Sequence, residues 1–157
     1  SLHDALPILK KIFFIVLAFF SLYFNAQQKK TNTSTAKSTS LSYMKNYNDK
    51  YPFEVKLIEK KGAFRTRLQK LMGKEKFQDL EDFFNVESPI TIKNNVMIAY
   101  GCMQHNCDGF YFKIFYDFNK DIINVGIKEG EKPIEVLGEK GIILDKAAAF
   151  KIDPYTD

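Results

Sequence analysis

The sequence contains no tryptophan and only two cysteines and two histidines in 157 residues. It has no Cys-x-x-Cys pair, which excludes the motif of thiol oxidoreductases and the attachment motif of c-type haem. It also lacks a nucleophile elbow and a glycine-rich phosphate-binding loop. Acidic neighbours such as Glu81 and Asp82 are typical of a solvated helix face rather than a catalytic pair. The chain is therefore not predicted to be an enzyme, and no cofactor is expected.

The sequence also lacks the clustered positive charge that nucleic-acid binding requires. The net charge is +4, but residues 27–61 carry eight basic and three acidic side chains, whereas residues 62–157 carry thirteen basic and fifteen acidic ones. No concentrated basic face is present, so a nucleic-acid partner is not expected. The length and the apolar content of 45% predict one domain with a single core.

The first part of the chain has the pattern of an export signal. Residues 1–9 continue no later pattern, resemble translated adapter sequence, and are left out of the fold prediction. Residues 10–26 combine two lysines with thirteen apolar or small residues and then turn polar, which predicts a signal peptide cleaved after Ala26. A membrane anchor is the alternative, but a span needs about 20 apolar residues. We therefore expect a periplasmic or secreted protein without a stable membrane span.

Helical patterns precede strand patterns in the remainder. Residues 27–42 are rich in Lys, Thr, Ser and Asn and predict a flexible linker. The single domain is expected over residues 43–157. Residues 51–58 fit a strand or a short helix, with helix favoured. Apolar residues at helical spacing predict a helix over residues 63–72 that ends at Gly73, and a second helical stretch over residues 77–84.

From Ile90 onward the apolar period changes to two. A hairpin is expected around Asn94-Asn95. Further strands are expected over residues 110–117, 122–128 and 134–137, and a short helix from Asp145 to Phe150. These elements predict an α+β fold in which an antiparallel β-sheet meander is packed by N-terminal helices.

Both cysteines lie in one loop between two predicted strands. In an exported protein, Cys102 and Cys107 most simply form a disulfide. Cys102, His105 and Cys107 could instead be three metal ligands, but a structural zinc site normally has four ligands in wider pairs. No second cluster exists, so no metal is expected. Closing so small a loop contributes only about 2 kcal/mol. The bridge is thus better suited to shaping a protruding recognition loop than to stabilising the whole fold.

The run Val96–Cys107 resembles the signature of the inhibitor of vertebrate lysozyme (Ivy) family, a strand that ends in Cys-Lys-Pro-His-Asp-Cys. The resemblance implies a helix-packed antiparallel sheet, a Cys102–Cys107 bridge, and His105 inserted into the active-site cleft of a C-type lysozyme. Met103, Gln104 and Asn106 stand where the motif has Lys, Pro and Asp.

The family includes dimers, so a homodimer is possible. The partner could also be another cell-wall hydrolase. The alternative is an exported envelope domain that binds or structures something other than a lysozyme.

Overall fold

The computed structural model describes residues 41–152. The predictions for residues 1–9, for the signal peptide and for most of the linker lie outside this range. None of the helices that are described combines the length and the apolar character that crossing a membrane requires.

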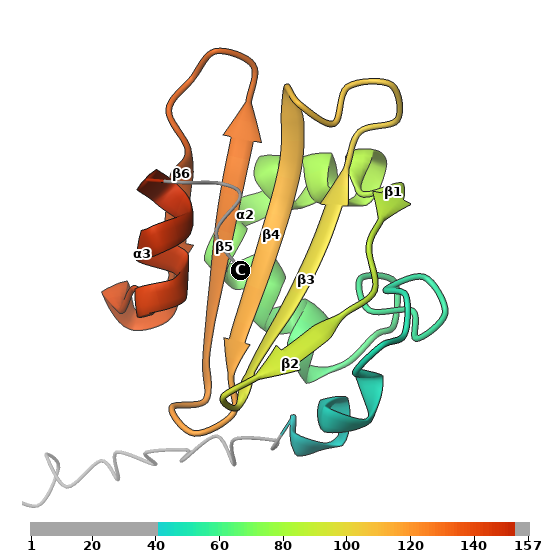
Figure 1. The fold of residues 1–157 in the computed structure, drawn as a ribbon, viewed down its shortest axis with the longest axis vertical. Coiled ribbons are helices and arrows are strands. Elements are labelled where there is room, and N and C mark those ends of the chain that lie inside the picture. Colours follow the sequence, from blue (N-terminus) through green and yellow to red (C-terminus); the bar gives the residue numbers. More distant parts are fainter. Residues whose placement is uncertain (1–40, 153–157) are drawn as a thin grey trace, which may run out of the picture. The chain divides into compact units, whose positions relative to one another are not determined.

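Six antiparallel strands form one sheet in the order β1-β3-β4-β5-β6, and β2 pairs with β3 on the same side as β1 (Figure 1). The bounds of the strands are β1 Val86–Glu87, β2 Thr91–Lys93, β3 Val96–Cys102, β4 Phe110–Asp117, β5 Ile122–Glu129 and β6 Glu135–Gly138. The predicted meander is confirmed. The β2–β3 hairpin turns at Asn94 and Asn95, whose φ angles of 54° and 60° are those of a type I′ turn.

One face of the sheet is covered by α2 (Ala63–Phe83), which lies behind the strands in Figure 1. Its buried side chains are Phe64, Leu68 and Met72 before Gly73, at the spacing of one helix face, and Phe77 and Leu80 after it. Gly73 leaves the helical conformation, with φ 75° and ψ 175°, so α2 bends there. The two predicted helical stretches are therefore the two arms of one bent helix.

The opposite face of the sheet is covered by α3 (Asp145–Ile152). Phe150 of α3 is fully buried, and its ring centroid lies 5.9 Å from that of Phe115 in β4. Gly126 of β5 makes room for Phe150, because a Cβ there would lie 2.2 Å from the ring. The prediction placed only the N-terminal helices against the sheet. With helices on both faces, β4 and β5 are buried along nearly their whole length.

The sequence favours a helix over residues 51–58. This prediction is wrong, because these residues fold into successive turns before α2. Lys56 has a φ of 52°, which interrupts a right-handed helix. The Glu54 carboxylate accepts the backbone N–H of Tyr51 at 2.8 Å, so this side chain closes the first of these turns. The preceding segment is a 3₁₀ helix, η1 (Ser42–Tyr47), and the fully buried Leu41 lies directly before it.

Candidate functional site

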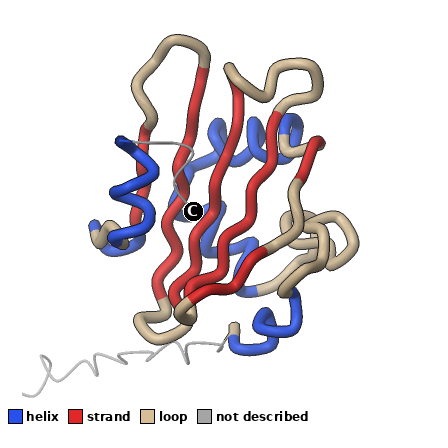
Figure 2. Tube along the Cα trace, viewed as in Figure 1, coloured by secondary structure: helices blue, strands red, loops and turns tan. Residues whose placement is uncertain are grey.

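The candidate site is the loop that joins β3 to β4, at the same end of the sheet as the β5–β6 loop (Figure 2). A disulfide joins Cys102 to Cys107, whose Cα atoms are 4.9 Å apart, so the predicted bridge is confirmed. Cys102 pairs with Tyr111 in the sheet, and the Met103 N–H donates to the Phe110 carbonyl at 2.9 Å. The sheet thus holds the base of the loop. Across residues 41–152, no cluster of three or more His, Cys, Asp or Glu side chains could hold a metal ion.

The tip of the loop is a tight turn over residues 103–106. The Asn106 N–H donates to the Met103 carbonyl at 3.0 Å, which closes the turn. His105 has a φ of 64°, whereas Gln104 keeps a φ outside the positive region. A positive φ at the third of four residues is the pattern of a type II turn, in which glycine is usual at that place. A histidine here makes the tip unusual.

A second turn follows directly and shares Asn106 with the first. The Asn106 carbonyl accepts the N–H groups of Gly109 at 3.1 Å and Phe110 at 2.9 Å. The Asn106 side chain lies over Gly109, where a Cβ would be 2.4 Å from its Oδ1 atom. A side chain at position 109 would therefore require the exposed Asn106 side chain to move. The Gly109 carbonyl also accepts the N–H of Gly130, which ties the loop to the β5–β6 turn.

The six predicted loop residues divide by exposure. Cys102 is buried, Met103 and Cys107 are half-buried, and Gln104, His105 and Asn106 are exposed. In the described part of the chain, the His105 imidazole makes no hydrogen bond and no ion pair. The loop therefore presents an imidazole whose two nitrogens are available to a partner.

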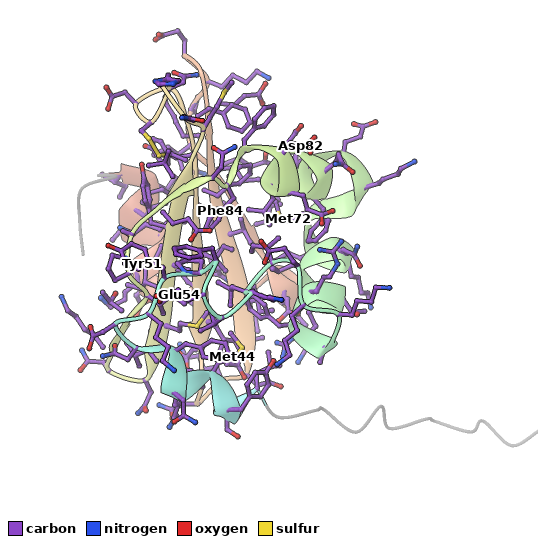
Figure 3. The ribbon with its side chains drawn as sticks, turned by 90° about the vertical axis from the view of Figure 1, so that its right-hand side faces the viewer. Met44, Tyr51, Glu54, Met72, Asp82 and Phe84 are labelled. Atoms are coloured by element: carbon purple, nitrogen blue, oxygen red, sulfur yellow. A yellow bond between two sulfur atoms is a disulfide. The ribbon has the colours of Figure 1, made fainter. Side chains whose placement is uncertain are left out.

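Aromatic rings support the loop from the α2 side. The rings of Phe83 and Phe110 meet edge to face, with centroids 5.0 Å apart. Phe84 lies against the backbone of Gly101, where a Cβ would be only 2.5 Å from the ring. Figure 3 shows Asp82 and Phe84 where α2 ends beside the sheet. The end of α2 is thus packed directly under the strand that leads into the loop.

Two residues outside the predicted loop also shape the site. The Asn85 side chain accepts the backbone N–H of Gln104 at 3.0 Å. Glu87 of β1 pairs with Gly101 and accepts the N–H of Phe53 at 2.8 Å. Burial raises the pKa of the Glu87 carboxyl, and the Phe53 hydrogen bond offsets this only in part. Asn85 lies 19 residues before Gln104, and no sequence pattern connects the two positions.

The family comparison agrees with this geometry. The family model described as inhibitor of vertebrate lysozyme (Ivy) matches residues 63–149, from the start of α2 into α3. No curated protein and no solved structure gives a significant match. The family match includes the six strands, the bridged loop and Asn85, and it covers more than half of the chain. The chain therefore belongs to the inhibitor of vertebrate lysozyme (Ivy) family.

Proposed function

We propose that this protein is an exported inhibitor of C-type lysozyme that inserts His105 into the active-site cleft of the enzyme. One observation carries the proposal: a family member presents an exposed imidazole, which has no partner among residues 41–152, at the tip of a disulfide-closed loop. The Cys102–Cys107 bridge is also typical of proteins that fold outside the cytoplasm. Residues 10–26 act as the signal peptide in this proposal, and the protein acts in the periplasm or after secretion.

The chemistry of the target suits an imidazole. Retaining glycosidases of the lysozyme type place two carboxyl groups about 5 Å apart across the scissile bond. One of the two has a raised pKa and acts as the acid, while the other stays ionised. An imidazole between them can donate to one and accept from or donate to the other, depending on its charge. The inhibitor excludes substrate by occupying the cleft, and no bond is formed or broken.

The ordered loop favours tight binding because less conformational entropy is lost when a preformed tip meets its partner. The bridge, the two successive turns and the bond from Gly130 to Gly109 all restrict the loop before binding. Asn106, which stands in place of the aspartate of the motif, closes both turns through its backbone. The altered loop sequence is therefore compatible with an ordered tip.

The test is hydrolysis of bacterial cell walls by a chicken-type lysozyme, with the oxidised protein titrated in. We expect stoichiometric inhibition by the wild type and a loss of at least about 30-fold in affinity for His105→Ala, the size of a binding hot spot. The matched control is Lys120→Ala. Lys120 is exposed in the β4–β5 turn, at the opposite end of β4 from the loop, so this variant should inhibit normally.

Each other result has a definite meaning. A folded, bridged wild type that does not inhibit would exclude animal-type lysozyme as the target. The candidates would then be other wall hydrolases, or the envelope partner of a non-inhibitory domain. Full inhibition by His105→Ala would keep the target but refute insertion of the histidine.

A further inference from the structure

Asn85 joins three parts of the site that are distant in sequence. Its backbone N–H donates to the carbonyl of Cys102 at 3.2 Å. Its side-chain Nδ2 donates to the carbonyl of Asp82 at 3.0 Å, in the last turn of α2. Its Oδ1 accepts the backbone N–H of Gln104 at 3.0 Å. One residue thus connects the end of the helix, the first cysteine of the bridge and the tip of the loop.

The tip needs such a connection because the disulfide holds only the ends of the loop. Between the two cysteines, a single backbone hydrogen bond, from Asn106 to Met103, closes the turn. His105 occupies the left-handed region, which is unfavourable for a residue with a Cβ and persists only where the surroundings enforce it. The bond from Gln104 to Asn85 fixes the residue directly before His105. It therefore supplies part of that enforcement.

We propose that Asn85 is a positioning residue that clamps Gln104 and so holds His105 in its binding conformation. The effect on inhibition rests on the function proposed above, whereas the effect on loop order does not. The Asn85 side chain is itself fixed at its other end by Asp82, so it is not free to follow a moving loop. The two hydrogen bonds of the Asn85 side chain thus fix the tip of the loop relative to the end of α2.

Proline at position 104 offers an independent way to obtain the same order. Gln104 is the second residue of the type II turn, where proline is favoured because its ring presets φ. Met103 before it is bonded to Phe110 as a continuation of the sheet, which suits a residue that precedes proline. Proline has no N–H, so it cannot bond to Asn85. A proline at position 104 and the hydrogen bond to Asn85 are thus alternative ways to order the same residue. In Gln104→Pro, the Asn85 side chain should no longer be needed to order the loop.

The experiment compares four oxidised full-length proteins: wild type, Asn85→Ala, Gln104→Pro and the double variant. Inhibition of chicken-type lysozyme and the association and dissociation rates are measured for each. We expect Asn85→Ala to weaken inhibition roughly threefold to tenfold, the effect of one hydrogen bond. The loss should appear as slower association, because a smaller fraction of the loops is competent to bind. The double variant should match Gln104→Pro within about twofold.

Two results would overturn the clamp. One is unchanged inhibition by Asn85→Ala. The other is an equal loss from Asn85→Ala with and without Gln104→Pro, since Asn85 would then act by another route, such as direct contact with the enzyme. Asn85→Asp serves as the conservative control. It keeps the acceptor for Gln104 but loses the donor to Asp82, so it should lie between wild type and Asn85→Ala.

Amide hydrogen exchange separates this inference from the proposed function. The Asn106 amide closes the turn, so its exchange rate reports how often the turn opens. Its exchange should accelerate at least about threefold in Asn85→Ala and return to the slower rate in the double variant. If no lysozyme were inhibited, the proposed function would fail while this measurement still decided the clamp. Unchanged exchange of the Asn106 amide in Asn85→Ala would refute the clamp.

Discussion

His105 combines an exposed imidazole with a backbone conformation that favours glycine. Its φ of 64° places the Cβ close to the following carbonyl, at a cost of roughly 1–2 kcal/mol. Glycine adopts this region without that cost, because it has no Cβ. A strained residue at an exposed tip is typical of a functional position, where the side chain matters more than local stability.

This conflict predicts that the stability of His105 variants follows the backbone preference of the new residue, whereas inhibition follows the loss of the imidazole. In His105→Gly the strain is relieved, although glycine also adds entropy to the unfolded chain. In His105→Val a branched side chain is forced into the same region. We expect the Gly variant to exceed the Val variant by about 1–2 kcal/mol in free energy of unfolding, measured with urea. Both should inhibit poorly. Equal stabilities would show that the loop rearranges around residue 105.

The contact between β3 and the end of α2 sets the position of the loop base. Gly101 precedes Cys102 and faces Phe84, the residue that follows α2. Phe84 also lies 6.5 Å from Phe112 of β4, centroid to centroid, so its ring cannot simply move inward. The missing side chain of Gly101 therefore allows the helix end, and Asn85 after it, to approach the bridge.

Gly101→Ala should disturb this packing. The added Cβ would lie 2.5 Å from the Phe84 ring, so we expect a loss of about 1–3 kcal/mol in free energy of unfolding. Inhibition should also weaken, because Asn85 would be displaced. Gly62→Ala is the matched control, since a Cβ there meets nothing within 4 Å. Adding Phe84→Leu to Gly101→Ala should restore part of the inhibition. No change in either property would show that the ring adapts freely.

At the scale of the whole domain, one charged cluster joins α2 to the end of the sheet opposite the loop. Arg67 of α2 donates to the Asp121 carboxylate at 2.6 Å and to the Glu139 carboxylate at 2.8 Å. The Tyr116 hydroxyl also donates to Asp121, and Glu139 accepts the N–H of Ile123, each at 2.8 Å. Hydrogen bonding to Glu139 raises the pKa of Arg67, and burial raises the pKa of the Tyr116 hydroxyl. The cluster stabilises the domain and lies far from His105 along the sheet.

Arg67→Met should therefore separate stability from function. Removing the guanidinium leaves two partly buried carboxylates without their main donor, so we expect a loss of about 2–3 kcal/mol in free energy of unfolding. Arg67→Lys should recover only part of it, because lysine cannot reproduce the forked contacts. Inhibition at 25 °C should stay normal while the protein remains folded. Weaker inhibition by a fully folded Arg67→Met would mean that the two ends of the sheet are coupled.

Local patterns in the sequence were sufficient for much of this architecture. The period-two strands, the Asn94-Asn95 turn and the interruption at Gly73 depend on residues close in the chain, and the structure confirms all three. The pairing of Cys102 with Cys107 was also predictable, because only two cysteines exist and they are five residues apart. The prediction for residues 51–58 was wrong, since their turns depend on the positive φ of Lys56, and no hydrophobic periodicity signals such a conformation.

The sequence alone thus predicted the strands β2 to β6, where the bridged loop lies and which histidine it carries, but not the short strand β1. Only the tertiary structure decided that α3 covers the second face of the sheet, that His105 adopts a positive φ and that Asn85 reaches Gln104. The physical reason is the separation along the chain over which each interaction acts. Hydrophobic period and turn chemistry act over a few residues, whereas the position of one side chain in the loop depends on how a helix end packs against a strand far away in the chain.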